Sequence, residues 1–193
     1  KWQLLKYVGE KNIEFQKNNE SNKKEVIEYT EDEIISFVEE IIKNDKKYSA
    51  KLLFKDVAPN QWDKDNLTKE NLDFSIDSVR LVNEYADRLM RTGFGQQLLK
   101  DYHDNFVTRI GAYLGEVIKH HKTGKYRWYD FNSIKENTVH LNGVFPSVED
   151  ESVLYAKELD KVLCPIYEAK QYIDGQSTYD NLLAYVEDAI KNK

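Results

Sequence analysis

The chain has 193 residues, of which 40% are apolar and 32% charged, and 13 Tyr, 8 Phe and 3 Trp supply large packing groups. This composition supports a folded core, and a single cysteine, Cys164, excludes a disulfide scaffold. Its apolar runs are only a few residues long, whereas a membrane-spanning helix needs about 20, so we expect no membrane partner. The net charge of −6, without a broad basic face, also argues against a nucleic-acid partner.

The first part of the chain is expected to be helical. Residues 17–25 are polar and indicate a solvated loop or linker. A capping pattern then opens an amphipathic helix at about 31–43, and residues 51–54 either continue it or form a strand. We predict an N-terminal helical extension or subdomain over residues 1–60, followed by an α+β domain over residues 61–193.

Two helices are predicted in the middle of the chain. The polar stretch 63–71 indicates a loop, after which Ser75 begins a helix with an apolar stripe. The segment 92–95 contains two glycines and breaks this helix. A longer helix is expected at about 96–121, with Gly124 beyond its end.

The pattern then changes to that of strands. Residues 125–131 alternate and are aromatic, and residues 138–141 indicate a second strand that pairs with them in antiparallel fashion. Because an isolated hairpin is marginally stable, we expect it to pack on the 96–121 helix or to recruit a strand from residues 2–8 or 50–57.

The last part of the chain is predicted to be helical again. A helical stretch runs from about residue 150 until Pro165 ends or kinks it, and helices follow at 166–173 and at about 178–191. The expected fold class is therefore α+β, predominantly helical, with a small antiparallel sheet late in the chain.

Two glycines within the predicted long helix distinguish its central segment. Gly111 and Gly115 lie four residues apart and share one face, at a cost of about 1 kcal/mol each relative to alanine. A face without side chains lets another backbone approach closely, so it either packs against a helix or the sheet, or forms the floor of a ligand pocket.

Glu116 is the weak candidate for a catalytic residue. Apolar neighbours would bury it partly and prepare it as a general acid or base, whereas the alternative is an ion pair on the helix surface. Helical spacing places Tyr113 and His120 on the same stripe, with Arg109 as a further assistant. The weak binding candidates are Tyr113, Glu116, His120 and Trp128.

No metal or cofactor is expected. The histidines are His103, His120, His121 and His140, and the adjacent pair points about 100° apart on a helix, which disfavours a shared ion. Cys164 lies in an apolar run and is interpreted as a buried structural thiol. Phosphate loops, dinucleotide fingerprints and nucleophile elbows are missing from the sequence.

Three segments together carry a resemblance to a known group of proteins. These segments are Leu72–Val79, which opens one helix, Gly111–Ile118, and Trp128 soon after a glycine-containing turn. Together they resemble a family of uncharacterised bacterial domains of unknown function, in which a "YLGEV"-type helix precedes a Trp-bearing strand. The resemblance covers roughly residues 70–190 and implies no established activity.

The functional hypothesis is a non-enzymatic protein-interaction or binding module of a bacterial protein of unknown function. The abundant Tyr and Trp residues suit contacts with a protein partner. The alternative is a small hydrolase-like enzyme that uses Glu116 as general acid or base. A cytoplasmic location is expected, although a signal peptide removed before Lys1 stays open, and the oligomeric state is left undetermined.

Overall fold

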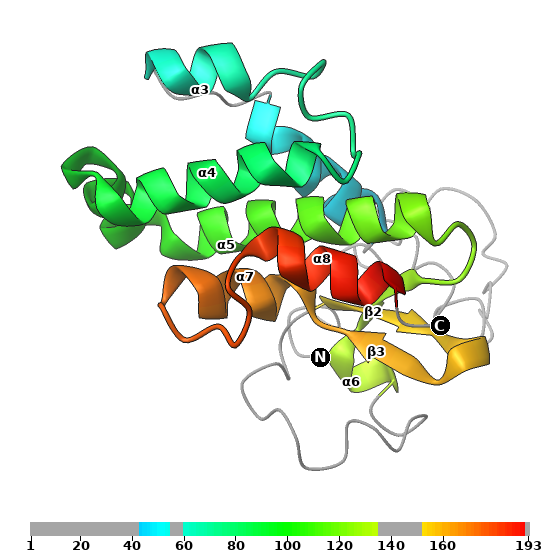
Figure 1. Ribbon diagram of the computed structural model, residues 1–193. Helices are drawn as coiled ribbons and strands as arrows, with labels where there is room; N and C mark the ends of the chain where they lie inside the picture. Colours follow the sequence, from blue (N-terminus) through cyan, green and yellow to red (C-terminus); the bar gives the residue numbers. More distant parts are fainter. Residues whose placement is uncertain (1–42, 55–59, 135–151, 192–193) are drawn as a thin grey trace, which may run out of the picture. The chain divides into compact units, whose positions relative to one another are not determined.

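The computed structural model describes residues 43–54, 60–134 and 152–191, which all belong to one compact unit of the chain, Ser36–Lys193 (Figure 1). The described elements, in chain order, are a helix over residues 43–54, α3 (Gln61–Asn66), α4 (Ser78–Arg91), α5 (Gly93–His121), β1 (Arg127–Asp130), α6 (Phe131–Ile134), β2 (Ser152–Ala156), the short 3-10 helix η3 (Lys157–Leu159), β3 (Lys161–Leu163), α7 (Pro165–Ile173) and α8 (Leu182–Lys191). The predicted α+β class, mainly helical with a small antiparallel sheet late in the chain, is confirmed.

The long helix α5 is the centre of the core, and it contacts α4, α7 and α8 (Figure 1). It begins at Gly93 because the Thr92 hydroxyl accepts a hydrogen bond from the Gly95 amide at 3.0 Å and so caps its first turn. The helix is kinked at Tyr102, whose φ of −139° is not helical. The apolar stripe predicted for α4 is confirmed, since its buried residues include Val79, Val82, Tyr85, Ala86 and Leu89.

The three strands form an antiparallel sheet in the order β1-β2-β3. Trp128 of β1 is opposite Leu154 of β2, which is opposite Leu163 of β3. Trp128 and Leu154 belong to the main core, whereas Val153 and Tyr155 of β2 belong to a second apolar cluster. Because neighbouring residues of a strand point to opposite faces, the sheet contacts one apolar cluster on each face.

The helix predicted from about residue 150 is wrong, because residues 152–163 form the hairpin of β2 and β3. A short apolar run suits a buried strand and a helix equally well, so periodicity did not distinguish them. Asp160 provides the turn, with a left-handed φ of 43°. Pro165 begins α7 instead of ending a helix, since a first-turn amide has no partner within the helix to lose.

Several helix boundaries differ from the prediction: α4 begins at Ser78 and not at Ser75, and α5 begins at Gly93 and not at about residue 96. Residues 51–54 continue a helix, which decides between the two alternatives for this segment. The first part of the predicted loop at 63–71 is helical, because Asn60 caps α3 by accepting a hydrogen bond from the Trp62 amide at 2.9 Å. The last helix begins at Leu182, four residues later than expected.

Several predictions fall outside the described residues. These are the helix at 31–43, the strand at 138–141 and the extra strand from residues 2–8. The domain division at residue 60 stays a prediction, although Ala50 and Leu53 of the helix over 43–54 belong to the same core cluster as α4 and α5.

Candidate functional site

The glycine face of α5 is a packing surface in two directions. A Cβ atom at Gly111 would lie 2.4 Å from the Ile166 Cα at the start of α7. A Cβ atom at Gly115 would lie 2.2 Å from the Trp128 ring of β1. The packing alternative is therefore confirmed, and the two glycines bring two different elements against one helix.

Glu116 and Trp128, both predicted binding residues, are in direct contact. The Trp128 indole Nε1–H donates to Glu116 Oε1 at 2.8 Å, and the Lys119 ammonium donates to the same oxygen at 2.7 Å. Trp128 is only 1% exposed, so its indole N–H needs a partner inside the protein. This geometry favours a structural role for the Glu116 carboxylate, which ties α5 to β1.

Tyr113, the third predicted binding residue, belongs to a separate network. The Phe74 amide donates to its hydroxyl at 3.1 Å, and the hydroxyl lies 2.7 Å from Ser78 Oγ. Because Ser78 Oγ donates to the Ser75 carbonyl at 2.6 Å, Tyr113 is the donor towards Ser78. Burial raises the pKa of Tyr113 to about 12, so the phenol is neutral at physiological pH. Its contacts hold the residues that precede α4.

His120, the fourth candidate, is exposed in the last turn of α5. Its ring packs edge-to-face against His121, with 5.5 Å between the ring centroids. The last turn of a helix attracts cationic side chains, so this position has a sufficient structural explanation. The four predicted residues therefore do not form one site: the structure joins Glu116 to Trp128 and places Tyr113 and His120 elsewhere.

A different site, which sequence reasoning missed, lies where α3, α4 and the start of α5 meet. It is a hollow of about 240 Å³, part of which is open to solvent. Its lining residues are Asn60, Asp63, Tyr85, Arg88, Leu89, Thr92, Phe94, Gly95 and Leu98. None of the four predicted binding residues lines it.

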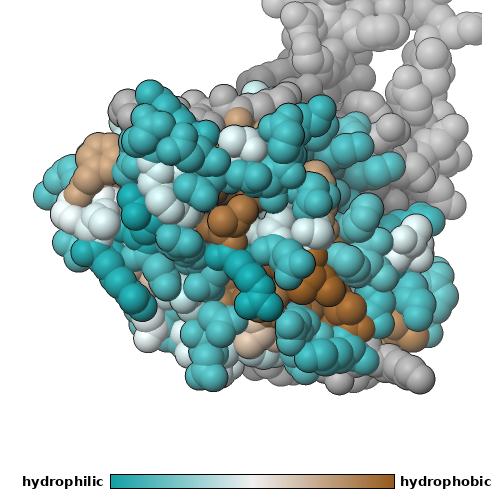
Figure 2. Space-filling model, turned by 45° about the horizontal axis from the view of Figure 1, so that its top comes forward, coloured by the Kyte–Doolittle hydropathy of each residue, from teal (hydrophilic) through white to brown (hydrophobic). Residues whose placement is uncertain are grey.

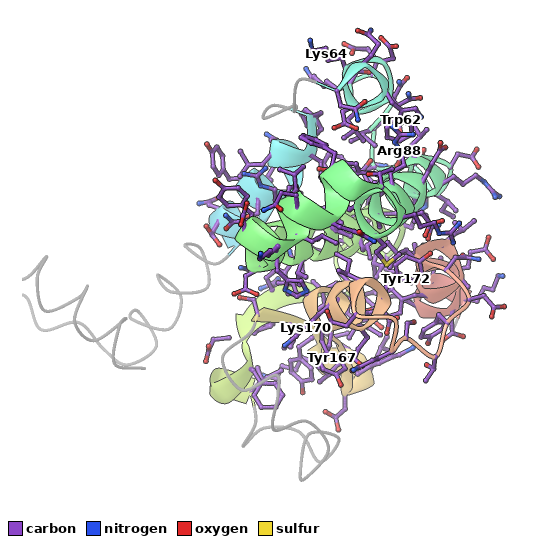
Figure 3. The ribbon with its side chains drawn as sticks, turned by 90° about the vertical axis from the view of Figure 1, so that its left-hand side faces the viewer. Trp62, Lys64, Arg88, Tyr167, Lys170 and Tyr172 are labelled. Carbon is purple, nitrogen blue, oxygen red and sulfur yellow. The ribbon has the colours of Figure 1, made fainter. Side chains whose placement is uncertain are left out.

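Arg88 and Asp63 give this hollow its charge. Figure 3 shows Arg88 beside Trp62, and the guanidinium carbon lies 4.7 Å from the centre of the indole ring. Such stacking holds the guanidinium plane in place. Burial raises the pKa of Asp63, whereas the positive charge of Arg88 lowers it. A buried acid and a stacked arginine far apart in sequence could not be paired from the pattern alone.

Gly95 allows α4 and α5 to approach each other closely beside this hollow. A Cβ atom there would lie 2.5 Å from both the Cα and the carbonyl oxygen of Leu89, so the first turn of α5 lies directly against the last turn of α4. Phe94 is thereby held at the edge of the hollow with 52% of its surface exposed.

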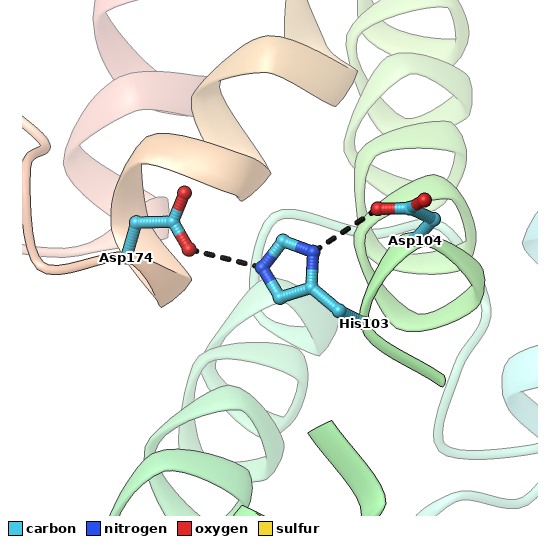
Figure 4. Close-up of polar contacts among 3 residues, drawn as sticks. All are labelled: His103, Asp104 and Asp174. Carbon is cyan, nitrogen blue, oxygen red and sulfur yellow. Dashed lines mark hydrogen bonds and ion pairs between the residues drawn. The ribbon is translucent and has the colours of Figure 1, made fainter. Parts of the chain in front are cut away.

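His103 forms a third polar group, which links α5 to the end of α7 (Figure 4). Its Nε2 lies 2.9 Å from an Asp174 carboxylate oxygen, and its Nδ1 lies 3.2 Å from Asp104 on its own helix. Because each nitrogen already faces a carboxylate, this geometry favours a link between helices over a general base.

Cys164 is the residue that precedes α7, and it packs against the second apolar cluster. The sequence predicts a buried thiol, whereas the structure shows Cys164 only partly buried beside this cluster. Among residues 43–54, 60–134 and 152–191, no group of three or more His, Cys, Asp or Glu side chains is arranged to hold a metal ion. None of the helices in these ranges has the length and apolar character needed to span a bilayer.

Comparison with known proteins gives no match: no family model, no curated protein and no solved structure is significantly similar to this chain. The resemblance to a bacterial family of unknown function therefore stays a prediction, and the function is argued from the site alone.

Proposed function

We propose that the chain is a non-enzymatic protein-interaction module whose contact surface is the α3–α5 corner, defined here as Trp62, Asp63, Arg88, Phe94 and Leu98. The observation that carries this proposal is the 52% exposed Phe94 ring at the edge of the hollow, next to the stacked Arg88. Aromatic residues and arginine are enriched where proteins contact one another, and they supply most of the binding energy.

Exposed apolar side chains also occur at other places on the described surface. Figure 2 shows a face that is largely hydrophilic, with hydrophobic side chains reaching the surface only in restricted areas. A second exposed aromatic residue, Tyr102, lies two turns further along α5 and has 55% of its surface exposed. We also propose that the chain belongs to the bacterial family that its sequence resembles, and that it is located in the cytoplasm.

A selection of peptides from a random displayed library tests the proposal. Peptides selected on the wild-type protein are expected to bind the Phe94→Ser variant at least tenfold more weakly, which corresponds to about 1.4 kcal/mol. Leu159→Ser is the matched control, because Leu159 is also an exposed apolar residue, at 41%, but lies on η3 between two strands.

The control variant is expected to bind the selected peptides as the wild type does. Equal binding to the wild type and to Phe94→Ser, or a selection that yields no binding peptide, would contradict the proposed function.

A further inference from the structure

We propose that the hollow of the α3–α5 corner binds an amide group of a polypeptide partner, with Arg88 Nε–H donating to the amide oxygen and Asp63 accepting from the amide N–H. This inference rests on the proposed function, since it names the chemical group by which the partner is anchored. A side-chain carboxamide, as in Asn or Gln, presents this pair of atoms on one edge, whereas a trans peptide group directs its N–H and C=O to opposite sides.

The donor is Arg88 Nε, which is buried and has no hydrogen-bond partner within the part of the chain that the structure describes. Buried N–H groups are nearly always paired, because an unpaired one loses its interaction with water without compensation. The Arg88 guanidinium lies over the Trp62 ring, and this contact restricts the movement of the side chain. The missing partner of Arg88 is therefore expected to come from outside these residues.

The acceptor is Asp63, which is only 5% exposed. Its carboxylate interacts electrostatically with Arg88, but no side chain in the described ranges donates a hydrogen bond to it. The two groups line the same hollow without forming a direct ion pair in the described structure. A bound group can consequently lie between a fixed donor and a fixed acceptor.

The charges of the hollow select a neutral ligand. A carboxylate would accept from Arg88 but would be repelled by Asp63, and an ammonium group would meet the opposite conflict. An amide carries no net charge and presents an acceptor and a donor side by side, so it satisfies both protein groups. Phe94 and Leu98 supply apolar contacts for the carbon chain that bears the amide.

Nuclear magnetic resonance of the Arg88 Nε–H group tests the inference on the wild-type protein. Propionamide, propionate and propylammonium are titrated separately, and the Arg88→Lys variant assigns the signal by removing it. Propionamide is expected to shift the Arg88 Nε–H signal and the Trp62 indole signal saturably, at concentrations of about a millimolar or above. Propionate and propylammonium are expected to act at least tenfold more weakly.

Variants of the two polar groups supply a second measurement. Asp63→Leu and Arg88→Met are expected to weaken propionamide binding at least tenfold. Asp65→Leu on the exposed side of α3 and Arg91→Met, whose side chain is 77% exposed, are the matched controls and are expected to leave binding unchanged. Asp63→Ala removes the acceptor without adding bulk and replaces Asp63→Leu if that variant does not fold.

The inference would be overturned by an Arg88 Nε–H signal that propionamide does not move, or by equal shifts by all three ligands. A bound water that stays at Arg88 Nε during the propionamide titration would also overturn it, because the hollow would then be a hydration site.

The selected peptides separate this inference from the proposed function. If they need Phe94 but bind equally well to Arg88→Met, the amide anchor is wrong and the interaction module stands. If propionamide binds as described but no peptide can be selected, the module is wrong and the amide site stands.

Discussion

The indole ring of Trp128 occupies the space that a side chain at Gly115 would need, 2.2 Å from the ideal Cβ position. The same indole donates its N–H to Glu116, one residue further along α5. A missing side chain and a neighbouring carboxylate thus place one tryptophan, and with it the first strand of the sheet.

Gly115→Ala is expected to lower the free energy of unfolding by about 1–3 kcal/mol, because the added methyl group forces the Trp128 ring or the strand to move. Gly93→Ala is the matched control, since a Cβ atom at Gly93 meets nothing within 4 Å. Urea denaturation of both variants measures the difference. Equal stability of the two variants would show that the Trp128 ring moves aside without cost.

Glu116→Leu is expected to cost about 1–3 kcal/mol of stability, because it leaves the buried Trp128 N–H without an acceptor. Glu116→Gln keeps an acceptor oxygen and is expected to cost less. Urea denaturation and hydrogen exchange of the Trp128 indole proton measure the two effects. Glu84→Leu, at an exposed position of α4, is the control for the change in polarity. Equal losses for both Glu116 variants would assign the effect to the Lys119 contact instead.

Tyr113→Phe is expected to lower stability at neutral pH by about 1 kcal/mol, because the partly buried Phe74 amide loses its acceptor. Tyr102→Phe removes the hydroxyl of a ring that is 55% exposed and is expected to leave stability unchanged. Thermal unfolding at pH 7 measures both variants. A Tyr113→Phe protein as stable as the wild type would mean that water replaces the hydroxyl.

The same variant is expected to change the stability at alkaline pH. Tyrosine ionises near pH 10 in an unfolded chain, whereas burial raises the pKa of Tyr113 to about 12 in the folded protein. Between these values the folded state holds the proton that the unfolded state has lost, so stability falls as pH rises from about 10 to about 12. Tyr113→Phe removes this contribution, and urea denaturation from pH 9 to 11.5 is expected to show a shallower fall. A fall of unchanged slope would contradict the assignment.

Glu168 leads to a prediction for stability between mildly acidic and neutral pH. Burial raises its pKa above the ordinary 4.5, although Ser177 donates a hydrogen bond to it at 2.5 Å. Its contribution to stability is therefore complete below about pH 4.5, and it is lost as the pH rises through the higher folded-state value. Glu168→Gln keeps an acceptor for Ser177 but cannot ionise. Its stability relative to the wild type is therefore expected to be higher at pH 7 than at pH 4.5.

Glu187→Gln is the control of opposite sign for this experiment. The Lys191 ammonium donates to Glu187 and lowers the pKa of that carboxyl, so its contribution is present at neutral pH and is lost on acidification. Urea denaturation between pH 4 and 7 compares the two variants. If the stability of both variants, relative to the wild type, changes with the same sign between pH 4 and pH 7, the raised pKa of Glu168 is contradicted.

The sequence predicted those parts of the fold in which one periodic pattern continues for several turns. The stripes of α4 and α5 are long enough to define a helix, and the close approach at Gly111 and Gly115 follows from their missing side chains. The hairpin of residues 152–163 was not predictable in this way, because its strands are only five and three residues long.

The site was harder to predict than the fold. The packing of the long helix on the next strand was expected from the sequence, but the hydrogen bond between Trp128 and Glu116 was not. Asp63 and Arg88 are brought together by a short capped helix in a stretch that appeared to be a polar loop. Their importance depends on burial and on an unpaired N–H group, which composition and spacing do not report.

Thr92 caps both the end of α4 and the start of α5. Its hydroxyl donates to the Arg88 carbonyl at 2.8 Å and accepts from the Gly95 amide at 3.0 Å, so a single residue separates the end of α4 from the start of α5. An inserted amino acid at this junction would separate the two hydrogen bonds of Thr92 and change the position of the Phe94 ring relative to Arg88. Natural length variation in this protein is therefore expected to spare this junction and to accumulate in other connections.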